Sequence, residues 1–229
     1  MTFSPYPPSA IDRAVFVNCP FDRDYKELFN ALLFVVYDCG FFPACALRSS
    51  DSGEDRMFRI RELVGQCRYA IHDILRVTID PNTQYPRFNM IFELGLYLGA
   101  KIEKSEKVCL VMDAEQTRYR AFCSDLAGYE IQAHNNDPAI LVSVVRNWLS
   151  SNEDQHLIIP GGEYIFYRYR KFLCHMKERC EFLHLNPEAV IFRDYIVMVE
   201  GWLHEHPLRL DDFTPSETTS ADDREAKVA

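Results

Sequence analysis

The sequence predicts an α/β fold, a flavodoxin-like five-stranded parallel sheet with helices on both faces, followed by a C-terminal helical pair. Short apolar runs alternate with segments of helical periodicity up to about residue 150. This alternation is typical of parallel sheets covered by helices on both faces. Two long helical patterns without a strand between them follow the "PGG" turn. The simplest arrangement with right-handed crossovers orders the strands 2-1-3-4-5.

The first half of the chain supplies three strands and two helices. "AVFVN", residues 14–18, is a compact apolar run that suits a strand buried on both faces. "YKELFNALLFVVYDCG" has helical spacing, and Gly40 suits its C-terminal stop. "FFPACAL" is a second strand, with Pro43 near its start or on a sheet edge. After the loop "SSDSGED", "RMFRIRELVGQC" is an amphipathic helix, and "RYAIHDI" is the third strand, ending at Asp73.

The second half begins with a polar loop, "LRVTIDPNTQYPRF", before the segment "NMIFELGLYLGAK". This segment is expected to be a helix, whose Gly95 and Gly99 share a face that a strand could approach closely. "KVCLVM" and "YEIQA" are the last two strands. "NNDPAILVSVVRNWLSS" is a helix capped by Asp137, with Pro138 in its first turn.

The C-terminal helical pair is expected at "EYIFYRYRKFLCHMKERCEFLHL" and "NPEAVIFRDYIVMVEGWLHEH". Its many aromatic residues fit two roles, packing as an antiparallel hairpin on the main domain or oligomerisation. The sequence therefore divides into an α/β domain at 1–150, a helical extension at 151–210 and an acidic disordered tail at 211–229.

Composition excludes several classes of function. The net charge is -9, and nothing resembles a broad basic surface, so direct contact with nucleic acid is not expected. The eight cysteines lack C-x-x-C spacing, which favours reduced cytosolic thiols over a disulfide framework. No signal peptide and no apolar run of about 20 residues is present, so we expect a soluble cytoplasmic protein that does not enter a membrane.

Motifs for common cofactors are also missing from the sequence. It contains no G-x-G-x-x-G and no P-loop, which argues against a dinucleotide redox enzyme or an ATPase, and no nucleophile elbow appears. The spacing of histidines and cysteines gives no metal site. We therefore expect neither a metal nor a cofactor.

The candidate site follows from the topology, because ligands of an open parallel sheet bind beyond the carboxyl ends of its strands. The residues at those ends, or close after them, are the candidate substrate-binding residues: Asn18, Pro20, Phe21, Asp22, Ser50, Asp51, Arg56, Asp73 and Asn89. Backbone amides of the loop from Ser50 to Gly53 could hold a phosphate. Asp73 could instead cap a turn, and the neighbouring His72 fits a structural histidine better than a ligand.

Glu93 is the catalytic candidate because it is an ionisable group in an apolar run. A glutamate is rarely buried unless it is paired or used in function. If Asn89 caps the helix, Glu93 shares its face and lies near the first turn, where the helix dipole favours an ionised carboxylate. Such a carboxylate can stabilise or attack the sugar during cleavage of a glycosidic bond. The alternative is an ion pair with Arg56, Arg87 or Lys101 that holds the loop.

Two stretches resemble known families. "FVNCPFDRDYKELFNAL" resembles the F-x-x-x-P-F strand, loop and helix that open TIR-like proteins. "IRELVGQCRYAIHDI" followed by "NMIFELGLYLGAK" resembles a pattern shared by that group and the nucleoside 2-deoxyribosyltransferases, a strand ending in Asp before a helix with Glu-Leu-Gly. The resemblance covers about residues 14–133 and leaves out the C-terminal helical pair.

The resemblance implies an N-glycosidic substrate, with Glu93 as the catalytic carboxylate and with Asp73 and the Asn18–Asp22 loop beside the sugar or base. Bacterial proteins of this group are often antiphage defence effectors that destroy NAD or nucleotides. Related N-glycosidases commonly complete their sites across subunit contacts. A homo-oligomer, or a complex with a partner protein of a defence system, is therefore expected.

Three functions follow as hypotheses. The first is an N-glycosidase that hydrolyses NAD+, whose nicotinamide leaves as a neutral molecule without a general acid. The second is a deoxyribosyltransferase or hydrolase of nucleosides or nucleotides, which would need a proton donor such as Asp73 or His72. The third is a non-catalytic nucleotide-sensing or assembly module.

Overall fold

The five strands form one parallel sheet in the order β2-β1-β3-β4-β5, as the sequence predicts. This computed structural model describes residues 12–48, 53, 55–77, 87–104, 106–153 and 158–208. The predicted acidic tail and the loop residues Ser50 and Asp51 lie outside the described residues. The strands are β1 (Ala14–Asn18), β2 (Phe42–Ala44), β3 (Tyr69–Asp73), β4 (Val108–Asp113) and β5 (Gln132–Ala133).

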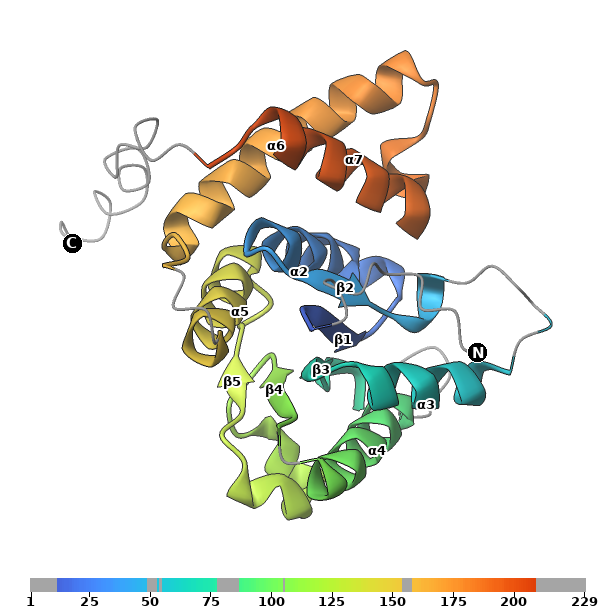
Figure 1. Ribbon diagram of the computed structural model, residues 1–229, viewed down its shortest axis with the longest axis vertical. Coiled ribbons are helices and arrows are strands. Elements are labelled where there is room, and N and C mark those ends of the chain that lie inside the picture. Colours follow the sequence, from blue (N-terminus) through green and yellow to red (C-terminus); the bar gives the residue numbers. More distant parts are fainter. Residues whose placement is uncertain are drawn as a thin grey trace, which may run out of the picture.

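Helices cover both faces of the sheet, and a further pair lies outside one of these layers (Figure 1). The α-helices are α2 (Lys26–Asp38), α3 (Arg56–Gln66), α4 (Asn89–Glu103), α5 (Pro138–Asn152), α6 (Gly162–Phe182) and α7 (Phe192–Glu205). Helices α2 and α5 cover one face, α3 and α4 cover the other, and α6 and α7 lie on the outer side of α2 and α5 (Figure 1). None of the described helices is long and apolar enough to cross a membrane.

Short 3-10 helices connect several of these elements. They are η1 (Arg23–Tyr25), η2 (Ala46–Arg48), η3 (Leu75–Val77), η4 (Arg118–Ala121), η5 (Ser124–Gly128) and η6 (Pro187–Ala189). Of these, η4 and η5 lie on the connection between β4 and β5.

The central strands are apolar because both of their faces are buried. Val15 and Val17 of β1 belong to the large core that α2 and α5 complete, whereas Ala14 and Phe16 belong to the smaller core under α3 and α4. Side chains of a strand alternate between the two faces of a sheet, so a strand covered on both sides needs apolar residues at successive positions. Strand β1 matches its predicted bounds for this reason.

Three local signals act as the sequence predicts. Gly40 follows α2 with a φ of +79°, the left-handed conformation that ends helices and favours glycine. Pro43 lies in β2, which is an edge strand, where a missing N–H costs no ladder bond. The Asp137 side chain accepts hydrogen bonds from the backbone N–H groups of Ala139 and Ile140 and so caps α5.

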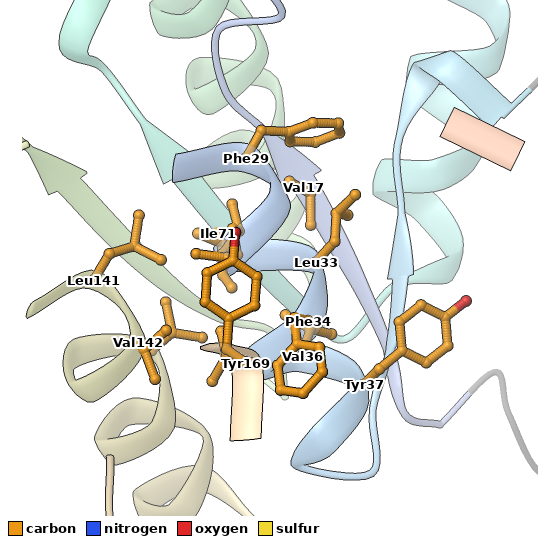
Figure 2. Close-up of a cluster of buried hydrophobic side chains, with 14 of the residues drawn as sticks. Val17, Phe29, Leu33, Phe34, Val36, Tyr37, Ile71, Leu141, Val142 and Tyr169 are labelled. Carbon is orange, nitrogen blue, oxygen red and sulfur yellow. The ribbon is translucent and has the colours of Figure 1, made fainter. Parts of the chain in front are cut away.

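Helix α2 lies at the centre of the larger core. Figure 2 shows Phe34 of α2 beside Tyr169 of α6, with Leu141 and Val142 of α5 nearby. The ring centroid of Phe34 lies 5.4 Å from that of Tyr169, 5.3 Å from that of Phe172 and 5.8 Å from that of Trp202. The aromatic residues of the helical pair therefore pack on the α/β domain, one of the two roles predicted for them.

A buried ion pair joins the same layers. Arg168 of α6 donates to both carboxylate oxygens of Asp38 at the end of α2, with Nε–Oδ2 at 3.0 Å and Nη2–Oδ1 at 2.9 Å. The two side chains are 7% and 2% exposed. Nη2 also donates to the carbonyl of His206 at 2.9 Å. The charge of Arg168 is thus satisfied inside a largely apolar interface.

The last helix begins later than the sequence predicts. Helix α7 begins at Phe192, whereas the pattern placed its start near Asn186. The Asn186 side chain instead caps η6, which has Pro187 in its first turn. Ile191 is then extended, with φ -74° and ψ 157°, and this separates the short turn from the long helix.

Candidate functional site at the carboxyl edge of the sheet

The ends of β1 and β3 form the switch point of the sheet. These two strands are neighbours, yet the chain leaves β1 through α2 towards β2 and leaves β3 through α4 towards β4. Helices that depart on opposite faces open a crevice beyond the strand ends, which is where ligands of doubly wound sheets bind. The candidate site therefore lies where the topology places it.

Asn18 fixes the start of α4 over this crevice. Its side-chain amide donates to the carbonyl of Met90 at 2.8 Å and to Nδ1 of His72 at 2.9 Å. Asn18 is 1% exposed, and both of its amide protons are used in these two bonds. Asn18 is thus a structural link among β1, β3 and α4, placed one helical turn from Glu93.

His72 is a buried neutral histidine, which agrees with the prediction that it has a structural role. Burial lowers its pKa from 6.5 to about 3. Its ring lies 5.7 Å from that of Phe16 and 5.4 Å from that of Tyr97. Since Nδ1 accepts from Asn18, the ring proton belongs on Nε2. His72 is therefore not a proton donor at neutral pH.

Acid should destabilise the protein through this histidine. In the unfolded chain the imidazole binds a proton below pH 6.5, whereas in the folded protein it does so only near pH 3. Its contribution to stability is present above pH 6.5 and is lost as the pH falls towards 3. Between pH 7 and pH 5 this loss amounts to about 2 kcal/mol. Urea unfolding at several pH values should show a weaker acid dependence for His72→Gln, but not for a control at the exposed His204. An unchanged dependence in His72→Gln would contradict this assignment.

Glu93 lies in the second turn of α4 and is 5% exposed. Its Oε1 lies 3.5 Å from Nη2 of Arg56, whose own side chain is 58% exposed. Burial raises the pKa of Glu93 above its ordinary value of 4.5, and the positive charge of Arg56 opposes this only in part. The carboxylate is thus nearly dry, is held by one long contact with a described residue, and is costly to ionise. This contact is one of the three ion pairs that the sequence left open.

Two expectations about α4 are wrong. Asn89 does not cap the helix, because Phe88 already has helical backbone angles and accepts the first helical bond from Phe92 N–H at 2.9 Å. Asn89 is exposed, although it lies four residues from the buried Glu93 and so on the same side of the helix. Gly95 and Gly99 are also exposed, and a Cβ built on either would meet nothing within 4 Å. No close approach of a strand explains these glycines.

Asp73 lies on the other face of the sheet from His72. Its Oδ2 accepts from the hydroxyl of Tyr25 at 2.6 Å and lies 3.0 Å from Nε2 of His134. Its Oδ1 accepts the N–H of Leu75 at 2.9 Å, so Asp73 does cap the turn after β3. Because neighbouring residues of a strand point to opposite faces, Asp73 does not join Asn18 and His72 on the Glu93 side. With 0% exposure, it is a structural hub in this state, and substrate contact at Asp73 stays a prediction.

Asp22 is occupied by arginines of the β3–α4 connection. Both of its oxygens accept bonds from Arg76, and Oδ2 also accepts one from Nη1 of Arg87 at 3.1 Å. Its side chain accepts the N–H of Tyr25 as well and so caps η1. Asp22 therefore organises the loop above β1.

Phe21 points towards the helical pair. Its ring lies 5.3 Å from that of Phe29 in an edge-on arrangement. Phe21 and Asp22 line a cavity of about 400 Å³. Its wall also includes Phe29, Leu33, Val190, Phe192 and Tyr195. Pro20 is buried in the loop before it. Of the predicted residues, the structure thus brings Asn18, Arg56 and Glu93 together and directs Phe21 elsewhere.

Cys19 is a buried thiol at the end of β1. It is 1% exposed and directly follows β1. Burial raises the pKa of its thiol well above 9.0, and the negative charges of Asp73, Glu93 and Asp22 raise it further. The thiol therefore stays protonated at neutral pH.

The sequence pattern missed Tyr25, Arg76 and His134, and it named Arg87 only as a possible partner of Glu93. Arg76 and His134 could have been found by the rule of strand ends, since they follow β3 and β5 closely. Tyr25 carried no signal. Within the part of the chain that the structure describes, no group of three or more histidine, cysteine or acidic residues could hold a metal.

Comparison with known proteins adds no family. No protein-family model matches the chain, and no curated protein matches it.

Proposed function

We propose that this protein is an N-glycosidase that cleaves the nicotinamide–ribose bond of NAD+, or the N-glycosidic bond of a related nucleotide. The supporting observation is Glu93, a carboxylate 5% exposed at the switch point, whose pKa burial raises despite the nearby Arg56. Holding such a group costs stability, and functional sites are where groups with shifted pKa values gather.

The chemistry suits a carboxylate without a partner acid. In surroundings from which most water is excluded, an ionised Glu93 can stabilise the positive charge that develops on ribose, or attack its anomeric carbon. Water then completes the reaction, giving ADP-ribose, nicotinamide and a proton. Nicotinamide leaves as a neutral molecule from a cationic ring, so no general acid is needed. The neutral His72 and the Asp73 on the opposite face favour this substrate over purine nucleosides, which want a proton donor.

The resemblance to TIR-like proteins and nucleoside 2-deoxyribosyltransferases supports the same reaction. It extends the proposal to a role in antiphage defence, with activity that depends on a homo-oligomer or on a partner protein. The alternative reaction is deoxyribosyl transfer or hydrolysis of nucleosides or nucleotides, and it would use the same carboxylate.

One observation favours a second candidate function, a non-catalytic nucleotide-binding or assembly module. The 3.5 Å contact between Arg56 and Glu93 ties α3 to α4, so Glu93 could serve the fold alone. In that case ligand binding would persist without turnover.

One assay tests these possibilities together. The purified protein is incubated with NAD+, deoxynucleosides and deoxynucleotides, and liberated bases are separated by chromatography. Release of nicotinamide from NAD+ supports the proposal, whereas release of bases from the deoxynucleosides or deoxynucleotides supports the alternative reaction, deoxyribosyl transfer or hydrolysis. Binding of the ligands with no base released from any of them, at high protein concentration where assembly is favoured, would select the module.

Arg56 should determine the pH below which kcat/KM falls. Catalysis needs the ionised carboxylate, and the positive charge of Arg56 lowers the pKa of Glu93. Arg56→Met should therefore move the acid limb of kcat/KM to higher pH. Arg61→Met, on the exposed side of the same helix, is the matched control. A limb that stays in place in Arg56→Met would show that Glu93 does not govern it.

A further inference from the structure

Two arginines from the β3–α4 connection meet on one carboxylate. Arg76 donates to Asp22 through Nε and Nη2, at 3.0 Å each, and Arg87 donates through Nη1 at 3.1 Å. Nε of Arg76 and Nη1 of Arg87 share the same oxygen, Oδ2. The two-bond fork that an arginine makes to a carboxylate also fits a phosphate.

The cluster is reachable from solvent. The side chains of Arg76, Arg87 and Asp22 are 33%, 42% and 19% exposed. Asp24, which accepts a further bond from Arg76 at 3.4 Å, is 83% exposed, so solvent screens its charge. A phosphate offers three acceptor oxygens and up to two negative charges, more than one carboxylate provides. A dissolved phosphate therefore has access to the arginine pair and offers it more charge and more acceptor oxygens than Asp22 does.

The position matches the phosphate end of a nucleotide. Asp22 follows β1 and Arg76 follows β3, so the cluster lies at the switch point of the sheet, where nucleotides of doubly wound folds bind. Arg76 lies in η3 and Arg87 lies two residues before α4, the helix that carries Glu93, so the arginine pair belongs to the connection that leads into that helix.

We propose that Arg76 and Arg87 form a binding site for the phosphate or diphosphate group of a nucleotide, and that Asp22 occupies it as a substitute anion in the free protein. That this nucleotide is the substrate rests on the proposed function; anion binding at the pair does not. The arrangement makes Asp22 a competitor of the ligand.

Inorganic pyrophosphate is the direct probe, measured by calorimetry and thermal shift at low ionic strength. Arg76→Met and Arg87→Met should each weaken its binding by about 10- to 100-fold, the worth of a charged hydrogen bond. Arg120→Met removes an exposed arginine of η4 and should change nothing. Asp22→Asn should bind pyrophosphate more tightly than the natural protein, because the competing charge is gone while an oxygen remains to cap η1.

The tighter pyrophosphate binding expected for Asp22→Asn distinguishes a phosphate site from a purely structural ion pair. If Asp22 only held the loop, its substitution would weaken binding or leave it unchanged, and the proposal would be overturned. It would also be overturned if folded arginine variants bound pyrophosphate as the natural protein does. ADP should bind at least about tenfold more tightly than adenosine if the arginines hold the phosphates; equal affinities would count against the site. Since these measurements need no turnover, they can fail or succeed independently of the base-release assay.

Discussion

Replacing Glu93 by glutamine is expected to lower base release by about 10²- to 10⁴-fold, the range in which enzymes depend on a single positioned group. Glutamine keeps the size of the side chain but cannot carry the negative charge that a developing ribosyl cation requires. The measurement is the rate of nicotinamide release from saturating NAD+. Glu103→Gln, at the exposed end of the same helix, is the matched control and should retain full activity.

The same variant should be more stable than the natural protein. Burial raises the pKa of Glu93, so its ionised form opposes folding above that pKa, and the cost disappears once the group is protonated at low pH. Glu93→Gln should thus raise the free energy of unfolding at pH 7 and lose this advantage as the pH falls towards 4.5. A variant that keeps turnover, or that is less stable at pH 7, would identify Glu93 as a structural residue.

Replacing Arg168 by methionine is expected to lower the free energy of unfolding by about 3–5 kcal/mol, the cost of leaving one buried charge without its partner. The Asp38 side chain is 2% exposed. Arg168 donates a hydrogen bond to each of its carboxylate oxygens, at 3.0 Å to Oδ2 and 2.9 Å to Oδ1. Burial already raises the pKa of Asp38 although Arg168 opposes this, so without Arg168 the carboxyl group must either bind a proton or remain charged in an apolar interface. Urea unfolding at pH 7 measures the loss.

A second substitution separates charge from packing. Asp38→Asn combined with Arg168→Met should recover most of the lost stability, because no buried charge remains. Arg170→Met, at an exposed position of the same helix, controls for removal of an arginine from α6. A double variant as unstable as Arg168→Met alone would show that the arginine acts through its packing on Trp202, whose ring centroid lies 5.1 Å away.

The elements of the sheet were predictable because the signals that mark them are local, and the order of the strands then followed from right-handed crossovers. Apolar runs mark the strands that are buried on both faces, and Gly40 and Asp137 mark helix ends by their own backbone preferences. The start of α7 was not predictable from periodicity. The expected helix began near Asn186, but the non-helical backbone of Val190 and Ile191 divides the segment before Phe192.

The site was predictable to the level of the sheet edge and not beyond it. The rule of strand ends gave Asn18 and Arg56, and the apolar run gave Glu93; Asn18 contacts Met90 in the first turn of the helix that carries Glu93, and Arg56 contacts Glu93 itself. It ignored the alternation of side chains along β3, which sends Asp73 to Tyr25 and away from Glu93. Which arginine would reach Glu93 depends on how α3 packs against α4, and contacts between distant segments of the chain leave no mark in a local pattern.

Helix α2 is buried from Ala31 to Asp38, by the sheet and α5 within the domain and by Tyr169, Phe172 and Trp202 outside it. A shortened chain ending after α5 would present these apolar surfaces to water and would be prone to aggregate. Helices α6 and α7 should therefore fold together with the α/β domain. A motion of α7 against α2 would be transmitted to the loop after β1 through Phe29, whose ring packs against both Phe192 and Phe21.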